Sequence, residues 1–484
     1  MTDAHVLSVD LGAESGRVWS VRLQGGRLTS HEVHRFRNRP VRVGDTLHWD
    51  VLSLWQDVRD GLEAALADGG GPAPHALGID AWAVDFGLLD RRGQLLGNPV
   101  HYRDARTRGM IERVASRLDP AAIFAETGIQ FLPINTLYQL AALAEANDPQ
   151  LEMAERLLLI PDLLHHWLTG RTATEFTNAT TTQLYDAVEG RWSPTLLDAL
   201  GLSDTLFPEV VPPGTQLGTY RGVPVIAPAT HDTASAVAGL PVTSGDVAYV
   251  SSGTWSLVGT EVTVPVRNEA ALRANVTNEG GVAGTTRLLK NVMGLWILQQ
   301  CRETWAREGA ELTYGELVGL AEQAAPLRSL VPVDHPDFLE PGDHPAIIAR
   351  LCREHGEPIP QDRGAITRCV LESLALAYRR VLDVLAELTG RRFDVVHVVG
   401  GGSRNALLNR FTADAAGVPV VAGPAEATVL GNAAVQMMAL GVFPDLATAR
   451  RTIAASVQLA YYEPSGDDRW EEATTRYARL EASA

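Results

Sequence analysis

The chain is poor in cysteine and in lysine. Its three cysteines, Cys301, Cys352 and Cys369, form neither a metal-ligand pattern nor the disulfide framework of a secreted domain. Reduced thiols are expected, although Cys352 and Cys369 could pair if the fold brought them together. Lysine occurs once, at Lys290, where it either serves a site that needs a compact ammonium group or survives an arginine-rich composition by chance.

Positive charge and long apolar runs are also scarce. The formal net charge of −17 argues against nonspecific nucleic-acid binding and would repel ATP. A nucleotide site would therefore depend on Mg²⁺, backbone N–H groups and helix N-termini. The sequence has no signal-peptide pattern and no apolar stretch typical of a membrane span, so we expect a cytoplasmic protein with no membrane partner.

The length and patterning favour two large α/β domains. The chain has 484 residues, 45% of them hydrophobic and 20% charged, which is ordinary for a globular enzyme and exceeds what one core usually supports. Each half opens with strand-like runs and continues with alternating helical and strand-like segments. We expect the boundary near residues 241–246, which gives domains over 1–242 and 243–484.

Both standard phosphate-binding loops, the Walker A sequence and the GxGxxG motif, are absent. Three other glycine-bearing turns follow strand-like runs, in VDLGAESGR, YVSSGTWSLVG and VVGGGSRN. A single turn of this kind is more often a hairpin, but together they outline a split nucleotide site whose backbone can approach phosphate. Asp10, at the end of the first strand, would either cap its turn or hold Mg²⁺ through water.

A second set of polar residues surrounds the segment PATHDTASAV. This segment reads as a loop that becomes a helix, and Asp232 is the best candidate for a general base, with a helix N-cap as its structural alternative. His231 is either a core histidine or a partner of a sugar hydroxyl. Trp82 is either core or an apolar face for a sugar, and the flanking Asp80 and Asp85 could cap turns.

Eleven segments, in order over nearly the whole chain, resemble the FGGY carbohydrate kinases of the actin-like ATPase superfamily, and among them the members that act on L-rhamnulose. They are DLGAESGR, GIDAWAVDFGLLD, YRDARTRG, GIQFLPINTLYQL, EFTNATTTQLYD, THDTASAV, YVSSGTWSLVG, NEGG, LLKNVMGLW, VVGGGSRNALLN and AGPAEATVLGNAAVQ. The resemblance implies two ribonuclease-H-like domains flanking a catalytic cleft. It also implies Mg²⁺-dependent transfer of the ATP γ-phosphoryl group to O1 of L-rhamnulose.

Carried onto this chain residue by residue, the resemblance makes Asp232 the general base. The N-terminal domain would bind the sugar and the phosphates, and the C-terminal domain would bind the nucleotide. The sugar would contact Ala83, His231, Asp232 and Thr233. The residues implied for ATP are Ala13, Glu14, Ser15, Gly16, Arg17, Thr254, Asn291, Gln299 and Gly401, with Asp10 implied for the metal. We expect small-molecule substrates only, and a monomer or weak homodimer.

Two positions depart from the family pattern. Ala83 stands where glycine is common, so a methyl group facing the sugar would narrow the pocket. Glu14 stands where a small polar residue is usual, and a carboxylate beside a triphosphate would be repulsive. We therefore expect Glu14 to point outward or to face Mg²⁺.

Three other functions are compatible with parts of this pattern. A kinase for another ketose or polyol, such as L-fuculose or xylulose, would share the fold and the nucleotide residues. An actin- or chaperone-like ATPase with a protein partner would leave the His231–Asp232 segment without a role. A sugar-binding regulator that has lost catalysis would not need Asp10 and Asp232 together.

Overall fold

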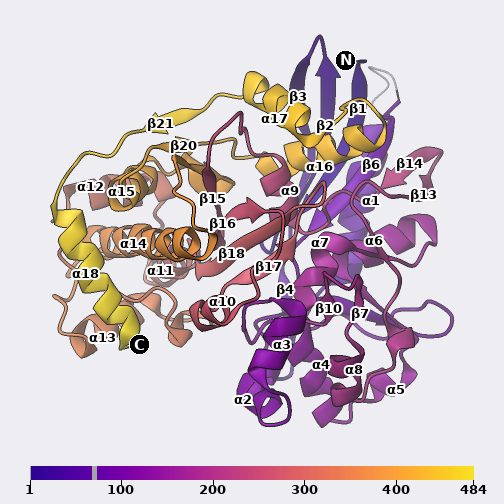
Figure 1. Cartoon of the computed structure of the whole chain (residues 1–484), viewed down its shortest axis with the longest axis horizontal. Coiled ribbons are helices and arrows are strands. Elements are labelled where there is room, and N and C mark those ends of the chain that lie inside the picture. Colours follow the sequence, from indigo (N-terminus) through magenta and orange to yellow (C-terminus); the bar gives the residue numbers. More distant parts are fainter. Residues whose placement is uncertain (1, 68–72, 484) are drawn as a thin grey trace. The chain divides into compact units, whose positions relative to one another are not determined.

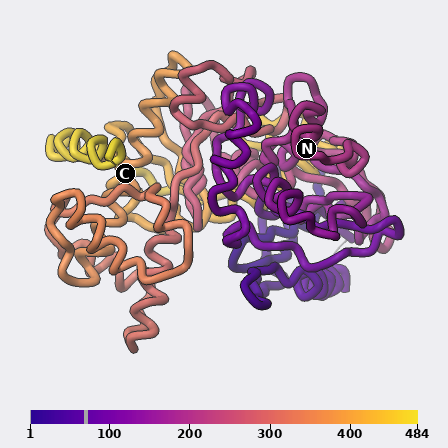
Figure 2. Tube along the Cα trace, turned by 90° about the horizontal axis from the view of Figure 1, so that it is seen from below, coloured from indigo at the N-terminus to yellow at the C-terminus, as the bar shows by residue number. Residues whose placement is uncertain are grey.

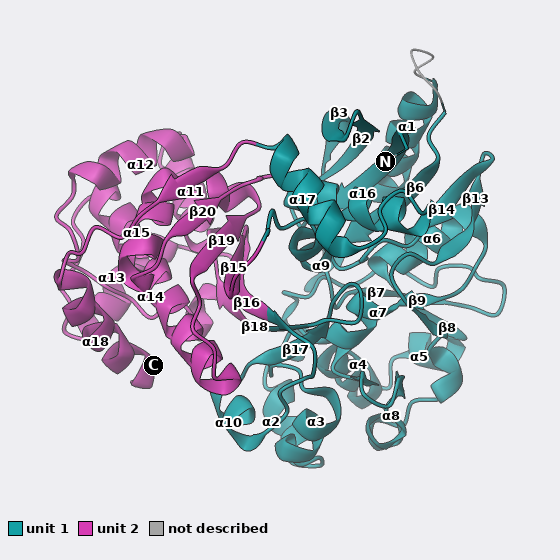
Figure 3. Cartoon of the chain, turned by 45° about the horizontal axis from the view of Figure 1, so that its top comes forward, with its two compact units in different colours: residues 1–243, 261–288, 427–457 teal, residues 244–260, 289–426, 458–484 magenta. Residues whose placement is uncertain are grey.

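The computed structural model describes residues 2–67 and 73–483, and the chain divides into two compact units (Figure 3). Unit 1 consists of residues 1–243, 261–288 and 427–457, and unit 2 of residues 244–260, 289–426 and 458–484. The domain limits inferred from sequence, 1–242 and 243–484, stay a prediction. Helices and strands alternate in both units, in agreement with the expected α/β class.

Unit 1 is built on a six-stranded sheet whose strand order is β13-β14-β6-β1-β2-β3. The bounds are β1 Ala4–Leu11, β2 Ser15–Gln24, β3 Arg27–Arg37, β6 Ala76–Ala81, β13 Gln216–Tyr220 and β14 Val223–Ile226. The first three strands form an antiparallel meander, whereas β1, β6 and β14 run parallel. Every residue of β1 is buried, as expected for a central strand with both faces covered.

Helices cover both faces of this sheet. On one face, α1 (Val51–Ala67) and α6 (Ile160–Thr169) bury apolar side chains at helical spacing against alternate β1 residues such as Leu7 and Val9. On the other face, α16 (Ala427–Ala439) and α17 (Leu446–Ser456) pack with Val6 of the same strand. The alternation of side chains along β1 therefore feeds two separate cores.

The helices α16 and α17 come from the far end of the sequence. In Figure 1 they lie beside the N-terminal strands. Figure 2 shows the Cα trace of the chain coloured from the N-terminus to the C-terminus. Two side chains of α16 fix the contact, because Gln436 Nε2 donates to the Leu7 carbonyl at 3.0 Å and Asn432 Nδ2 donates to Asp80 Oδ2 at 2.5 Å. The same helix packs on α9 (Asp232–Ala238).

The remaining elements of unit 1 form a helical region with short two-stranded sheets. They are β4 Pro40–Val43, β5 Thr46–Trp49, β7 Phe86–Leu89, α2 Met110–Ala115, α3 Pro120–Thr127, α4 Thr136–Glu145, α5 Pro149–Met153, β8 Arg156–Leu159, β9 Thr174–Glu175, α7 Phe176–Ala179, β10 Tyr185–Asp186, β11 Arg191–Trp192, α8 Pro194–Leu200, β12 Val210–Val211 and α10 Glu269–Ala274. Their apolar side chains form a further core around α4 and β8.

Unit 2 is built on the parallel strands β15 (Val247–Ser252), β19 (Val395–Val399) and β20 (Val420–Ala422). The strand order of this sheet is β17-β18-β16-β15-β19-β20-β21. The chain passes from one unit to the other within β16 (Trp255–Val262) and β18 (Thr286–Met293). Strand β17 (Thr277–Gly280) of the same sheet belongs to unit 1, and β21 (Ala460–Tyr462) to unit 2. The hairpin of β15 and β16 confirms the strand, small turn and strand expected here.

The helices of unit 2 are α11 Trp296–Arg307, α12 Tyr314–Gln323, α13 His344–Glu354, α14 Arg363–Thr389, α15 Ala406–Ala416 and α18 Arg469–Ala482. Helices α14 and α15 alternate with the strands β19 and β20, in agreement with the alternating segments expected of the second half. The C-terminal helix α18 is partly buried, since Trp470, Tyr477 and Leu480 are covered by the rest of the protein. Within residues 2–67 and 73–483, no helix combines the length and apolarity needed to cross a membrane.

Candidate active site

The topology of unit 1 brings three loops to one edge of its sheet. The parallel strands β1, β6 and β14 end at this edge, and their carboxyl ends lead into the turn at Gly12, the turn at Ala83 and the start of α9. A backbone bond from Ala81 N to Thr230 O, 2.9 Å long, joins the second and third loops. Ligand sites of α/β sheets lie at such carboxyl ends, so this edge is the candidate site of unit 1.

The first loop is the β1–β2 turn, where the sequence predicted phosphate contacts. Gly12 N donates to Ser15 O at 2.9 Å, and Asn38 clamps the turn by donating from its side chain to Gly12 O and from its backbone to Glu14 O. Glu14 is exposed, which agrees with the expectation that it points outward. Gly16 lies in β2, where a side chain would collide with Phe36, so its missing Cβ serves packing as well.

Asp10 is buried opposite Arg17 across the β1–β2 ladder, and Arg17 Nη2 donates to Asp10 Oδ2. In the parallel register Asp10 also lies opposite Asp80 of β6. Mg²⁺ takes carboxylate oxygens and keeps several of its waters, so it does not require a cage of three protein ligands. The described residues hold no such cage. A single buried carboxylate with Asp80 beside it fits the water-mediated Mg²⁺ site expected at Asp10.

The turn cap considered for Asp80 is not found in the structure. Asp80 lies inside β6, is fully buried and accepts a hydrogen bond from Asn432 of α16. Burial, together with the negative charges of Asp10 and Asp232, raises its pKa well above the usual value. The charges of Asp10 and Asp232 therefore act on Asp80 at this edge of the sheet, and burial favours its neutral form.

The second loop is a strained turn between β6 and β7. Asp85 N donates to Ala83 O at 2.9 Å across a single residue, Val84, whose φ is +67°. This is a γ-turn of the rare positive-φ kind, and a β-branched residue pays an unusually high conformational cost there. The strain is held in place from α4, because Thr136 Oγ1 and Gln139 Nε2 both donate to the Val84 carbonyl. Strain of this kind is concentrated at functional sites.

Asp85 is the anchor of this turn. Its buried carboxylate accepts hydrogen bonds from the indole N–H groups of Trp49 and Trp82, from Tyr102 N and from Gln139 Nε2, at 2.6–3.2 Å. Burial raises its pKa to about 6 despite these donors. Trp82 packs on Trp49 with ring centroids 4.2 Å apart and belongs to the core. Of the two interpretations of Trp82, the structure supports the core residue.

The third loop ends at Asp232, the predicted base. The structural alternative for Asp232, a helix N-cap, does not hold: α9 begins at Asp232, and His231 occupies the cap position without a side-chain cap bond. The Asp232 side chain is 29% exposed and receives a hydrogen bond from Thr233 Oγ1 at 3.2 Å. Its pKa is raised by desolvation and by the charge of Asp10, while the neighbouring His231 opposes the rise. A carboxylate with a raised pKa is a better proton acceptor.

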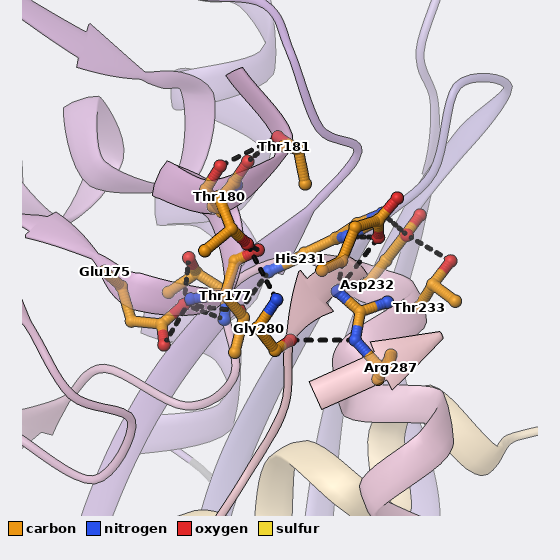
Figure 4. A network of polar contacts seen from close by, with 12 residues as sticks. Glu175, Thr177, Thr180, Thr181, His231, Asp232, Thr233, Gly280 and Arg287 are labelled. Atoms are coloured by element: carbon orange, nitrogen blue, oxygen red, sulfur yellow. Dashed lines mark hydrogen bonds and ion pairs between the residues drawn. The ribbon is translucent and has the colours of Figure 1, made fainter. Parts of the chain in front are cut away.

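A buried network fixes the backbone just before Asp232 (Figure 4). Glu175 accepts from both N and Oγ1 of Thr230 at 2.9 Å and from both N and Oγ1 of Thr177. Thr177 Oγ1 in turn accepts from His231 N at 3.3 Å. The His231 ring lies between Asp232 and the buried pair Glu279 and Arg287, and its side chain is only 8% exposed. Sequence reasoning assigned no role to Glu175, Glu279 or Arg287.

In unit 2, the second and third glycine-bearing turns lie against each other. A side chain at Gly400 would approach Ser252 O to 2.8 Å, and one at Gly402 would collide with Ser252 Oγ. Gly400 also has a φ of +80°, which favours glycine. Gly401, predicted to contact ATP, is exposed between them with open space around its Cα. The two turns therefore meet at the carboxyl ends of β15 and β19.

The other predicted nucleotide residues of unit 2 surround the start of α11. Trp296 N donates to Thr254 O at 3.2 Å, which joins the β15–β16 turn to this helix. Gln299 lies in the first turn of α11 and Asn291 in β18, and both are partly exposed. Lys290 precedes Asn291. Burial raises the pKa of Asp334 to about 6, and the positive charge of Lys290 opposes this rise. The single lysine therefore partly compensates a buried carboxyl group.

The thiols are buried and free. Cys352 and Cys369 are neighbours, as the sequence allowed, and they interact as thiols rather than as a disulfide. The hydrogen bond with Cys352, together with burial, holds the pKa of Cys369 well above its usual value. Neither lies among the predicted site residues, which agrees with the expectation of reduced cysteines.

Comparison with known proteins identifies the family. Models of the FGGY family of carbohydrate kinases match residues 5–245 (N-terminal domain) and residues 248–440 (C-terminal domain). The chain is 44% identical over 479 residues to the protein named Rhamnulokinase from Bacteroides thetaiotaomicron, covering 97% of this chain and 98% of that one. It is 44% identical to the Rhamnulokinase of Pectobacterium atrosepticum, covering 96% and 94%.

Solved structures share the fold at low sequence identity. The ligand-bound xylulose kinase of Lactobacillus acidophilus has a TM-score of 0.81 at 16% identity, covering 99% of this chain and 98% of that one. The glycerol kinase of Plasmodium falciparum with ADP has a TM-score of 0.78 at 16% identity, with the same coverage. At this identity the likeness is one of fold alone. The two family models together span most of the sequence, and the chain belongs to the FGGY family of carbohydrate kinases.

Proposed function

We propose that this kinase transfers the γ-phosphoryl group of ATP to O1 of L-rhamnulose. The chemistry rests above all on one observation, the partly exposed Asp232 carboxylate at the start of α9, with His231 on one side and Thr233 on the other. The choice of sugar rests on relatives named Rhamnulokinase, which are 42–44% identical over 95–97% of the chain.

Asp232 would accept the proton of the sugar hydroxyl as the hydroxyl oxygen attacks the γ-phosphorus. Desolvation and the charge of Asp10 raise the pKa of Asp232, which strengthens it as a base. The hydrogen bonds of Glu175 to Thr230 and Thr177 hold the backbone that carries this carboxylate. Such fixation favours transfer, because phosphoryl transfer depends mainly on positioning and on electrostatic stabilisation.

The sugar would bind at Ala83, His231, Asp232 and Thr233. Ala83 belongs to the γ-turn anchored by Asp85, so its position is tightly defined. His231 and Thr233 flank the base and offer polar groups to hydroxyls next to the reacting one. The methyl group of Ala83 would restrict the size of the sugar on that side.

The phosphates of ATP would contact Ala13, Glu14, Ser15, Gly16 and Arg17, and the nucleotide would contact Thr254, Asn291, Gln299 and Gly401. Asp10 would hold Mg²⁺ through water, with Asp80 next to it in the strand register. When bound, Mg²⁺ neutralises charge on the phosphates. Arg17 pairs with Asp10 and would balance its negative charge while the metal is absent. We expect the enzyme in the cytoplasm, as a monomer or weak homodimer.

The test is the initial rate of ADP formation from Mg²⁺-ATP with L-rhamnulose, compared between wild type and Asp232→Asn. We expect sugar-dependent turnover that falls by about 10²–10⁴-fold in the variant, the usual contribution of general base catalysis, with ATP binding retained. L-Fuculose and xylulose serve as competing substrates. Preference for either would reject L-rhamnulose, and hydrolysis independent of any sugar and equal in both proteins would reject the kinase.

A further inference from the structure

Arg287 is a buried arginine beside the candidate base. Its side chain is 0% exposed, and it makes three contacts with neighbours that all belong to unit 1. Nε donates to Gly280 O at 2.8 Å, while Nη2 lies 3.1 Å from His231 Nδ1 and 3.1 Å from Glu279 Oε2. Figure 4 shows the guanidinium group of Arg287 next to Gly280 and His231.

A buried ion pair is a costly way to stabilise a fold. Removing both charges from water costs several kcal/mol per ion in order of magnitude, and an apolar pair of similar size often serves stability equally well. The Glu279 side chain is only 5% exposed, so Arg287 and Glu279 bear most of this cost. A role in the candidate site would account for the presence of this buried ion pair. The contact of Arg287 with His231 indicates what that role is.

The contact with Arg287 determines which nitrogen of His231 carries the proton. A guanidinium group can only donate hydrogen bonds, so His231 Nδ1 must accept. A neutral imidazole with an accepting Nδ1 carries its hydrogen on Nε2. His231 Nε2 lies 3.5 Å from Asp232 Oδ1, so this N–H faces the base. Glu279 Oε2, 3.3 Å from Nδ1, would favour the opposite tautomer if Arg287 were absent.

We propose that Arg287 is a positioning residue that holds His231 as the Nε2–H tautomer, with Glu279 balancing its charge. In this state His231 presents a donor to Asp232 and cannot take over the proton that Asp232 receives from the sugar hydroxyl. Asp232 is thereby kept as the single proton acceptor. The inference rests on the proposed role of Asp232 as the general base.

The surrounding backbone makes this arrangement rigid. Gly280, whose carbonyl accepts from Arg287 Nε, is itself held by a 2.8 Å hydrogen bond from its N–H to Thr180 Oγ1. The other end of the contact is fixed because His231 N donates to Thr177 Oγ1. Both partners of the Arg287–His231 hydrogen bond are therefore tied to the helical segment 176–182 (Figure 4).

The direct test is nitrogen NMR of the wild-type enzyme labelled with ¹⁵N-histidine. The signals of His231 are assigned by their loss in His231→Gln. We expect Nδ1 to show the chemical shift of an unprotonated ring nitrogen and Nε2 that of a protonated one. A protonated Nδ1 in the wild type overturns the proposal, and this outcome requires no variant at position 287 to fold.

The variant Arg287→Met leaves Glu279 facing Nδ1. We expect Nδ1 to become protonated and kcat to fall on the order of 10²-fold, as for a misplaced catalytic group, while the KM for ATP is unchanged. Arg287→Met combined with Glu279→Gln buries no charge, and the new amide can donate to Nδ1. This double variant should restore the unprotonated Nδ1 signal. Its kcat should be about tenfold higher than that of Arg287→Met, the scale of one good hydrogen bond. Unchanged tautomer and kcat in Arg287→Met overturn the proposal.

Arg368→Met is the matched control. Arg368 also pairs with a buried glutamate, Glu372 at 2.7 Å, but it lies on α14 in unit 2. Its loss should lower stability without moving the His231 signals or kcat. Asp232→Asn separates this inference from the proposed function. Full turnover in that variant rejects the base and this inference with it, whereas lost turnover together with a protonated wild-type Nδ1 rejects only the role of Arg287.

Discussion

Gly431 of α16 packs directly against the carbonyl oxygen of Ser235 in α9. A Cβ at position 431 would collide with that oxygen, and it would also lie 2.7 Å from Gly239 N. The close approach of these two helices requires glycine because only backbone atoms meet at the contact. The contact matters for function because α9 begins at Asp232, so α16 helps to define where the candidate base lies.

Gly431→Ala should therefore push α9 and α16 apart. We expect a loss of about 1–3 kcal/mol in the free energy of unfolding, the usual cost of overpacking, because no flexible side chain can yield. Because Asp232 would also be displaced, kcat should fall even under conditions in which the variant is fully folded. Chemical denaturation and sugar-dependent ADP formation measure the two effects.

Gly319→Ala provides the comparison. This glycine lies in α12, where a Cβ would meet no atom within 4 Å, so alanine should be neutral or stabilise the helix by up to about 1 kcal/mol. If the two variants had the same free energy of unfolding and the same kcat, the α9–α16 contact would not determine stability or the position of Asp232.

Thr136→Val should loosen the strained turn at Val84. The hydroxyl of Thr136 donates to the Val84 carbonyl at 2.7 Å, and valine keeps its shape without that donor. Because the turn carries Ala83, we expect the KM for the sugar to rise about tenfold or less, equivalent to the roughly 1 kcal/mol of one hydrogen bond, while the KM for ATP stays constant. Steady-state kinetics with each substrate varied in turn gives both values.

Thr367→Val removes a buried hydroxyl of α14 that donates to Arg363 O within the helix at 2.8 Å. Thr367→Val should change neither the KM for the sugar nor the KM for ATP. A rise in its sugar KM would show that the loss of any buried threonine hydroxyl raises this KM. An unchanged sugar KM in Thr136→Val would contradict the role of the turn.

Sequence reasoning succeeded where the signal was local. The segment PATHDTASAV was predicted to be a loop that becomes a helix, and α9 begins within it at Asp232. The contacts that complete the site are not local. Arg287 and His231 are 56 positions apart, and Asp80 and Asn432 are 352 apart. No periodicity links such pairs, and Arg287 lies in a strand that reads as ordinary sheet.

The cap interpretations that do not hold have the same origin. A cap was considered for Asp80, and as the structural alternative to the base for Asp232, because a carboxylate beside a turn usually satisfies nearby backbone N–H groups. In the structure, Asp80 is satisfied by a side chain of α16, and Asp232 is the first residue of its helix rather than the cap. Only the tertiary packing of α16 on β6 and α9 distinguishes these cases.

The three thiols should react slowly in the native enzyme. Cys301, Cys352 and Cys369 are at most 2% exposed, burial raises the pKa of Cys301, and the hydrogen bond with Cys352 raises that of Cys369. Reaction requires an accessible thiolate, so a colorimetric disulfide reagent should find almost no thiol in native protein and three in denaturant. A fast-reacting native thiol, or fewer than three after unfolding without reductant, would contradict this assignment.

Asp85→Asn should remove a pH-dependent contribution to the free energy of unfolding. Burial raises the pKa of Asp85 from 3.8 to about 6, so the native state holds this proton more tightly than the unfolded chain does. The resulting stabilisation is fully present below about pH 4 and is lost as the pH rises through about 6, a change of about 3 kcal/mol. The free energy of unfolding of wild type minus that of the variant should therefore fall across this range and then level off.

Urea denaturation at a series of pH values measures this difference. The control is Asp198→Asn, an exposed position on α8, which is expected to follow the wild type throughout. A difference that is constant with pH would mean that Asp85 titrates alike in both states, and that its four donors fully offset its burial.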